Sequence, residues 1–185
     1  MTKQLGKELI NTWEWLDAYC LTQRGICELA CGQHAIIVVQ IDRFNELRNS
    51  LGEERFKAFQ SKFETLMKTY ALDDTIVAKY NDSTYVVVLH YINGREEIAD
   101  ISQEIRESVE VARQEWGVDA SVSVGAAECH HDPECGYKCA ASLAMNALKI
   151  AHGTPEGYHI APETTKRPAK VGTFTKVLGA VMSLQ

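Results

Sequence analysis

The sequence predicts an α+β domain with a central, mostly antiparallel β-sheet, helices packed around it and an N-terminal helix in front. Amphipathic helical stretches alternate with short β-branched apolar runs along the 185-residue chain. Two such runs, 75–80 and 84–91, are separated only by a short polar stretch, which indicates a β-hairpin and therefore antiparallel strands. Apolar residues make up 45% of the chain, enough to fill one core. A sheet covered by helices on one face fits this order.

The N-terminal segment, residues 1–22, contains the first predicted helix. Its apolar side chains recur at the three-to-four-residue spacing of an amphipathic helix over residues 4–19, at Leu5, Leu9, Trp13 and Leu16. This helix is expected either to contact a protein partner or to fold back onto its own domain, and the pattern does not choose between them.

The predicted core domain, residues 23–161, alternates helices and strands. Strands are expected where apolar and β-branched residues cluster, at 35–41, 75–80, 84–91, 120–127 and 157–160. Helices are expected at 23–31, from Phe44 onward with a break near Gly52, at 94–116 and at 137–153. Residues 162–185 predict a basic linker and a possible C-terminal helix.

Charge and hydropathy exclude two classes of partner. The formal net charge of −6 argues against a general affinity for nucleic acid or for acidic membranes. No apolar run approaches the ~20 residues that a membrane-spanning helix needs. The first residues also lack the apolar core of a signal peptide. We therefore expect a cytoplasmic protein.

Five segments, in order, resemble the GGDEF domain of diguanylate cyclases over roughly residues 17–160. "VVQIDRFNELRNSLG" is similar to the family's IDIDxFKxINDxxG, and "VAKYNDSTYVVVL" to VARYGGDEFVVLL. "SVSVGAA" resembles VSIGVA, and "AMNALKIAHGTPEGYHI" resembles ADxALYxAKxxGRNxV. "DAYCLTQRG" looks like a shortened form of DxLTGLxNR. The resemblance implies the palm-like GGDEF fold.

The resemblance also implies where a cyclase would hold two divalent metals on a nucleotide triphosphate, and this sequence departs from it there. The first metal-binding acid falls on Gln40, whereas Asp42 keeps the second acidic position of that motif. Asp82 lies in a glycine position and Thr84 in that of the essential glutamate. The degenerate hairpin positions are Asn81, Asp82, Ser83, Thr84 and Tyr85. Read without the resemblance, these residues suit a plain hairpin turn.

The nucleotide-binding positions implied by the resemblance are substituted as well. The base-recognising residues fall on Arg48 and Lys57, and the phosphate-binding residues fall on His152 and Glu156. A glutamate would repel a triphosphate. The RxxD of the family's inhibitory site is absent before the hairpin. We therefore expect no diguanylate cyclase activity.

Two hypotheses of function follow. The first is a non-catalytic GGDEF-like regulatory or scaffold domain that acts through a protein partner or a homodimer. The alternative is a sensor that binds a small nucleotide in the modified cleft, with Arg48, Lys57 and His152 as candidate contacts.

The six cysteines lie in two groups, and thiols are expected in a reducing cytosol. Weak candidate zinc ligands are pairs four residues apart on predicted helices, Cys27 with Cys31 and Cys135 with Cys139. The spacing differs from the CxxC of most zinc modules, and buried cysteine is the simpler interpretation. No cofactor is expected, zinc being the one exception considered.

Overall fold

The structure, a computed structural model, describes residues 11–12, 33–72, 75–129 and 136–162. Its strands are β1 (Asn11–Thr12), β2 (Gln33–Ile41), β3 (Thr75–Lys79), β4 (Thr84–Ile92), β5 (Val122–Cys129) and β6 (Tyr158–Ile160). Its described helices are α2 (Phe44–Leu51), α3 (Glu53–Lys68), α4 (Arg95–Trp116) and α5 (Gly136–Ala151). Each predicted strand after residue 32, and the helices at 94–116 and 137–153, agree with these ranges within two residues at either end.

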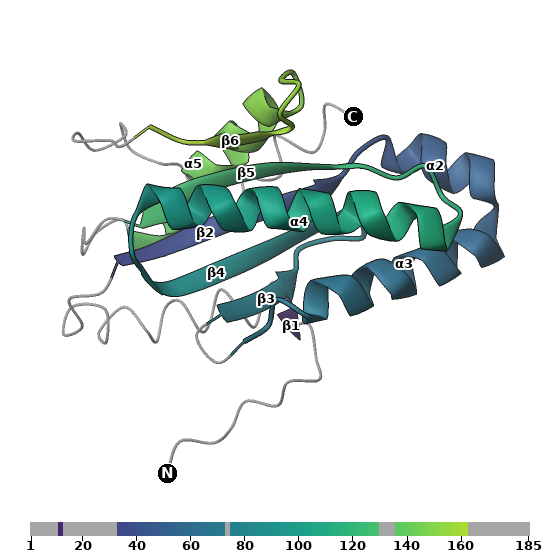
Figure 1. Ribbon diagram of the computed structural model, residues 1–185, viewed down its shortest axis with the longest axis horizontal. Coiled ribbons are helices and arrows are strands. Elements are labelled where there is room, and N and C mark those ends of the chain that lie inside the picture. Colours follow the sequence, from purple (N-terminus) through teal and green to yellow (C-terminus); the bar gives the residue numbers. More distant parts are fainter. Residues whose placement is uncertain (1–10, 13–32, 73–74, 130–135, 163–185) are drawn as a thin grey trace, which may run out of the picture.

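The strands form one sheet in the order β1-β3-β4-β2-β5-β6 (Figure 1). β4 and β5 flank β2 and run antiparallel to it, and β3 is antiparallel to β4. Only the outer pairs, β1 with β3 and β5 with β6, are parallel. The predicted mostly antiparallel sheet is therefore confirmed.

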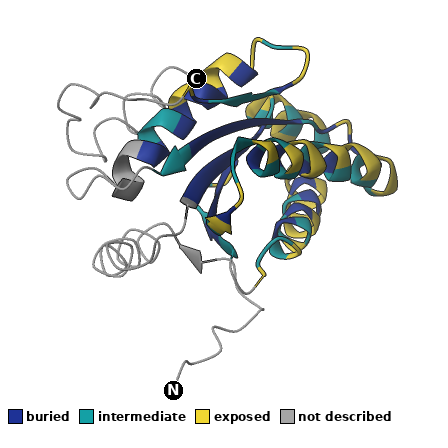
Figure 2. Cartoon of the chain, turned by 60° about the vertical axis from the view of Figure 1, so that its left-hand side comes forward, coloured by how far each residue is buried: buried dark blue, intermediate teal, exposed yellow. Residues whose placement is uncertain are grey.

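Helices cover both faces of the sheet, so the prediction of a single covered face is wrong. α3 and α4 pack on the face that carries Ile37 and Val39, and α5 packs on the face that carries Ile36 and Val38. The cause is visible in β2, which is apolar at every position from 35 to 39 and therefore has no side that can face water. Figure 2 shows the central strands buried and the outer sides of the helices exposed.

Close approach of α5 to the sheet depends on small residues. Ala140, Ala144 and Ala147 form much of its buried side. On the facing strand β5, a Cβ at Gly125 would lie 2.2 Å from the backbone nitrogen of Leu148. The alanines and this glycine thus set the distance between α5 and β5.

The N-terminal prediction needs one correction. Asn11 and Thr12 form β1, which pairs with Ala78 and Lys79 of β3, so a continuous helix over 4–19 is wrong at these two residues. Strand pairing with β3 overrides the local helical pattern there. The rest of that segment, the helix expected at 23–31 and the tail from residue 163 lie outside the described residues. No helix in the described part of the chain is long and apolar enough to cross a membrane.

Candidate functional site

Three of the positions at which the sequence departs from the resemblance, Gln40, Thr84 and His152, meet at the carboxyl end of β2. Gln40 is paired with Thr84 on β4 and with Ser123 on β5, so three polar residues lie side by side on neighbouring strands. The last turn of α5 brings His152 to the same place. Asp42 follows directly after β2. The strand register and the end of α5 therefore bring together residues that are distant in the sequence.

Gln40 is held by hydrogen bonds at both ends of its amide. Its Nε2 donates to the hydroxyl of Thr84 at 3.3 Å, and its Oε1 lies 2.8 Å from Nε2 of His152. Gln40 is 5% exposed and Thr84 is 1% exposed. The amide thus links β2, the hairpin and α5 within the protein interior.

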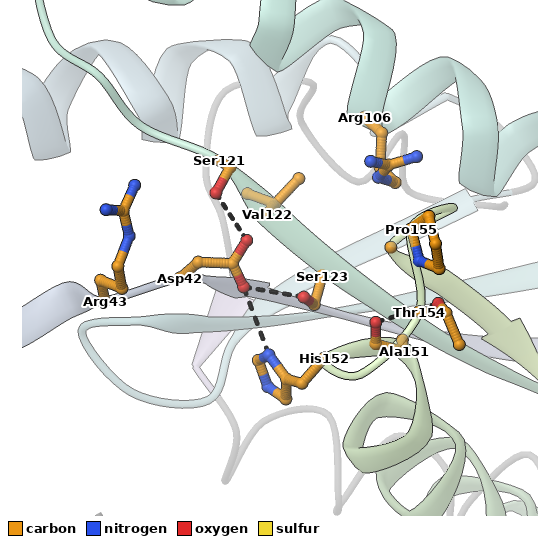
Figure 3. Close-up of a pocket in the computed structure, with 11 residues that line it drawn as sticks. Asp42, Arg43, Arg106, Ser121, Val122, Ser123, Ala151, His152, Thr154 and Pro155 are labelled. Atoms are coloured by element: carbon orange, nitrogen blue, oxygen red, sulfur yellow. Dashed lines mark hydrogen bonds and ion pairs between the residues drawn. The ribbon is translucent and has the colours of Figure 1, made fainter.

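Asp42 accepts three hydrogen bonds (Figure 3). The hydroxyls of Ser121 and Ser123 each donate at 2.7 Å, and Nδ1 of His152 lies 3.3 Å from the carboxylate. Burial raises the pKa of Asp42, but the hydrogen bonds from His152 and the two serines outweigh burial and hold the pKa below 3.8. Asp42 is therefore an ionised carboxylate that hydrogen bonds within the protein stabilise.

His152 joins these two groups through both ring nitrogens. Two proton arrangements satisfy all the atoms involved. In one, a doubly protonated ring donates to Gln40 and to Asp42. In the other, a neutral ring donates only to Asp42, and the amide of Gln40 is turned so that its nitrogen donates to the ring. Gln40, Thr84, His152, Asp42, Ser121 and Ser123 form what we call the Gln40–Asp42 network.

The hairpin is stabilised by its own side chains. Oδ1 of Asn81 accepts from the backbone nitrogen of Ser83 at 2.9 Å and from its hydroxyl at 3.0 Å, as in an Asx turn. Asp82 is an exposed residue whose carboxylate lies 3.3 Å from Nζ of Lys79. The predicted interpretation of this stretch as a turn held by its own residues agrees with these contacts.

Tyr85 belongs to the core. It is fully buried, its ring lies 5.2 Å from that of Phe63, and its hydroxyl donates to Glu64 of α3 at 3.4 Å. Burial, followed by the negative charge of Glu64, raises the pKa of the Tyr85 hydroxyl. Among the five hairpin positions, Tyr85 is therefore a packing residue.

These residues do not fit the divalent metals that a cyclase requires. Magnesium is bound mainly by charged carboxylate oxygens. At the two positions that the sequence resemblance assigns to metal ligands, Gln40 and Thr84 have uncharged side chains that bond to neighbours within the protein. The carboxylate of Asp42, two residues after Gln40, already contacts the hydroxyls of Ser121 and Ser123 and the ring of His152.

Two pockets adjoin the Gln40–Asp42 network, and both are lined by Asp42, Arg43 and His152. The smaller pocket has a volume of about 330 Å³ and is also lined by Gln40, Ser83 and the first residues of α2. The larger one, about 460 Å³, lies between α4, β5 and the loop after α5 (Figure 3). Its remaining polar lining includes Arg106, Ser121, Ser123 and Thr154. We call the larger one the Arg106 pocket.

Of the predicted nucleotide contacts, only His152 lines these pockets. Arg48 packs over the ring of Phe56, with its guanidinium carbon 6.0 Å from the ring centroid. Lys57 forms an exposed ion pair with Glu53 at 2.9 Å, one turn away on α3. Both cations lie on α2 and α3 and line neither pocket.

Arg106 is a pocket residue that the sequence did not single out. Its Nε is buried and has no hydrogen-bond partner among the described residues. Its guanidinium rests on Gly157, where an added Cβ would lie 2.7 Å from Nη2. In the sequence, Arg106 is one more charged residue on an amphipathic helix, and nothing local indicates that α4 would place it against residue 157.

The cysteine predictions are largely untested. Cys27, Cys31 and Cys135 lie outside the described residues, and of Cys139 only its place in the backbone of α5 is described. Among the described residues, no group of three His, Cys, Asp or Glu side chains is already arranged to hold a metal ion.

Comparison with known proteins identifies a family and a fold. The sequence model of the diguanylate cyclase GGDEF domain matches residues 23–154. The GGDEF domain of DgcB from Caulobacter crescentus, solved in complex with c-di-GMP, has a TM-score of 0.71 and 17% identity, over 87% of this chain and 98% of that chain. The active GGEEF domain of a diguanylate cyclase from Vibrio cholerae has a TM-score of 0.71 and 14% identity, over 85% of this chain and 100% of that chain.

A third similar structure contains a bound protein. The diguanylate cyclase SiaD from Pseudomonas aeruginosa, solved in complex with its activator SiaC, has a TM-score of 0.56 and 12% identity, over 65% of this chain and 47% of that chain. At such identities these structures establish the fold alone, and the palm-like GGDEF fold predicted from the sequence is confirmed. Among curated protein sequences, none matches significantly.

Proposed function

Because the chain belongs to the diguanylate cyclase GGDEF domain family, we propose that it is a non-catalytic member, which acts as a regulatory scaffold by binding a protein partner or a second copy of itself. The Gln40–Asp42 network carries this proposal. A cyclase needs charged oxygens at the carboxyl end of β2 and in the hairpin, whereas here both positions hold neutral groups that bond to each other.

The energetics favour keeping the network intact. To ligate a metal, Gln40 would have to release His152 or Thr84, and both Gln40 and Thr84 are almost fully buried. Leaving a buried donor or acceptor without its partner costs about 1–3 kcal/mol. A neutral amide oxygen gains less from a divalent cation than a carboxylate does. The substituted site is therefore better suited to hold β2, the hairpin and α5 together than to hold a nucleotide.

Action through a partner is supported by the substituted nucleotide contacts and by one relative. Arg48 and Lys57 are engaged with Phe56 and Glu53. SiaD shows that a protein of this fold can work in a complex with another protein. A domain that has lost its chemistry but kept its fold can retain that kind of contact.

The catalytic half of the proposal is tested by assaying the purified full chain for c-di-GMP. The protein is incubated with GTP and either magnesium or manganese, the nucleotides are separated by chromatography, and the active Vibrio cholerae domain serves as the positive control. We expect no c-di-GMP above the protein-free blank. Product formation by the wild type above this blank would refute the non-catalytic proposal, and its loss in Q40A or T84A would make the network part of a working active site.

The scaffold half is tested by light scattering after size exclusion and by affinity capture from a lysate of the source cells. A homodimer, or one partner that remains bound at stoichiometric amounts after washing, is the expected result. A monomer that captures nothing would leave the scaffold proposal without support and would favour the second candidate below.

A second candidate, a sensor for a small nucleotide, is favoured by the Arg106 pocket. Two arginines line the pocket, Arg43 and Arg106, and the Nε of Arg106 has no hydrogen-bond partner in the described chain. Arg43 and Arg106 are the cationic side chains in the lining of this pocket, and they would contact a bound phosphate group.

Calorimetric titration with GTP, GMP and c-di-GMP, with and without magnesium, tests the sensor. If the pocket binds one of them, R106A should weaken binding at least about tenfold, since a hydrogen bond to a charged group contributes about 1.5–3 kcal/mol. R48A is the matched control and should bind like the wild type. Equal weakening by both variants, or no heat with any nucleotide, would refute the sensor.

A further inference from the structure

Three residues of the types that bind zinc, two histidines and a cysteine, lie in a row at the other end of β2. In the strand register, His34 of β2 is opposite His90 of β4 on one side and Cys129 of β5 on the other. Because side chains alternate along strands, the three residues point to the same face of the sheet as Ile36, Val88 and Ala127, which α5 covers. His34, His90 and Cys129 are called the His–Cys row.

The two histidines are a few tenths of an ångström closer than two ligands of one zinc ion would be. Their Nδ1 atoms are 3.1 Å apart, and the ring centroids are separated by 5.1 Å with the planes at 84°. Two nitrogens bound to a tetrahedral zinc at ~2.0–2.1 Å are roughly 3.3–3.4 Å apart. A single N–H···N hydrogen bond also fits this distance, so the spacing admits a metal without demanding one.

The backbone of β2 and β4 is distorted next to His34 and His90. The register of β2 and β4 shifts between Gln33 and His34, so that Tyr91 has no partner in the ladder. Tyr91 has a φ of 60°, which is unfavourable for a bulky aromatic residue. Bulges of this kind re-aim neighbouring side chains and are common beside functional sites. Here the distortion follows His90 directly.

Cys129 is the third candidate ligand, and its thiolate would make the site selective for zinc. Within the described residues no third side chain is already in ligating position, so Cys129 would have to turn about its Cα–Cβ bond. Residues directly opposite each other in an antiparallel pair have Cα atoms about 4.5–5.5 Å apart, which leaves the sulfur within reach of His34. Imidazole and thiolate together select zinc over magnesium or calcium.

We propose that His34, His90 and Cys129 bind one zinc ion, which ties β2, β4 and β5 together at the end where β2 begins. The site is separate from the Gln40–Asp42 network, because the six residue steps along β2 from His34 to Gln40 span ~20 Å. It does not depend on the proposed scaffold function. A tetrahedral ion leaves one further position for water or for another side chain of this chain.

Zinc content of the untagged full chain tests the proposal. The protein is produced with zinc in the medium, kept reduced, dialysed and analysed for metal, and we expect one zinc per chain. H90A, H34Q and C129S should each lower the zinc content to about a tenth or less, since even partners that only orient a ligand alter metal affinity 10–100-fold. H159A, a histidine change on β6, is the matched control and should keep the zinc.

Cobalt substitution gives a readout that a merely structural histidine pair would not produce. Co²⁺ bound at the row should show the intense visible bands of a tetrahedral site and a thiolate charge-transfer band that C129S removes. Because His34 is only 4% exposed, folding of H34Q is checked by circular dichroism. His90 is only half-buried, so H90A should disturb the fold less than H34Q does.

Two results would overturn the proposal. One is a wild-type protein that binds neither zinc nor cobalt under these conditions, because the row would then be a hydrogen-bonded histidine pair. The other is zinc retained by folded H90A and C129S but lost from C135S or C139S, because the metal would then be held elsewhere.

Discussion

Replacing Asp42 by asparagine would test whether the Gln40–Asp42 network stabilises the fold. The change keeps the size of the side chain but removes its charge and turns one acceptor oxygen into a donor group. Ser121, Ser123 and His152 all point their hydrogens at this carboxylate. At least one of the three must therefore lose its acceptor in the variant.

The expected loss of stability can be worked out from the three contacts. Hydrogen bonds to a charged group contribute about 1.5–3 kcal/mol each. The contact to His152 is longer, 3.3 Å against 2.7 Å for the serines, so it contributes less to the free energy of unfolding than either serine does. The Asp42 side chain is 22% exposed, so water can replace part of what is lost. We expect D42N to lower the free energy of unfolding by about 2–3 kcal/mol at neutral pH.

The pH dependence has a definite sign. The pKa of Asp42 in the folded protein lies below its ordinary value of 3.8, so the ionised carboxylate is favoured by folding. Its contribution is fully present above the ordinary pKa and is lost as the pH falls through the lowered one. The difference in stability between the wild type and D42N should therefore be constant near neutral pH and shrink below 3.8.

Urea unfolding followed by circular dichroism, at neutral pH and at several values down to strong acid, measures both effects. D119N is the matched control, because Asp119 is an 80% exposed carboxylate whose loss should change stability by less than about 0.5 kcal/mol. The reasoning is refuted if D42N behaves like D119N, or if the gap between D42N and the wild type widens in acid.

Three further predictions concern packing, and each is measured by urea unfolding. F63A should cost about 3–5 kcal/mol, because Phe63 of α3 is completely buried and its ring contacts those of Tyr85 and Trp116; a loss below about 1 kcal/mol would contradict this placement. G125A should cost at least about 3 kcal/mol, because the new Cβ would lie 2.2 Å from a backbone atom of α5 that cannot move alone; a G153A control, with its nearest atom at 3.6 Å, should be far milder. G157A should cost about 1–3 kcal/mol, from a φ of 62° and from collision with Arg106. In an R106A background the collision is absent, so the cost of G157A should fall there, and an unchanged cost would show that Arg106 does not rest on Gly157.

Much of the fold is readable from the sequence because it is encoded by local spacing. The stripe of Phe56, Phe59, Phe63 and Met67 recurs every three or four residues, and α3 buries these four side chains. The hairpin also follows from a local signal, a short polar turn between two β-branched runs. Such patterns depend on neighbours within one or two turns of the chain and so remain visible in one dimension.

The predictions that were wrong concern contacts between distant segments. Whether helices cover one face or two depends on which apolar side of β2 each helix reaches, and both sides are apolar. The two residues of β1 are strand because β3 lies beside them, and their own sequence favoured a helix. Local pattern cannot supply either fact.

The sequence by itself determined the family, the order of the elements and the absence of the expected acids at Gln40 and Thr84, since these depend only on residue type and position. How Gln40 and Thr84 are hydrogen-bonded was decided by the tertiary structure. The hydrogen bond between Gln40 and His152 joins residues 112 positions apart, and the contact of Arg106 with Gly157 joins two separate elements. Their geometry exists only once β2, β4, β5 and α5 have packed, because strand register and helix placement alone bring such side chains within bonding distance.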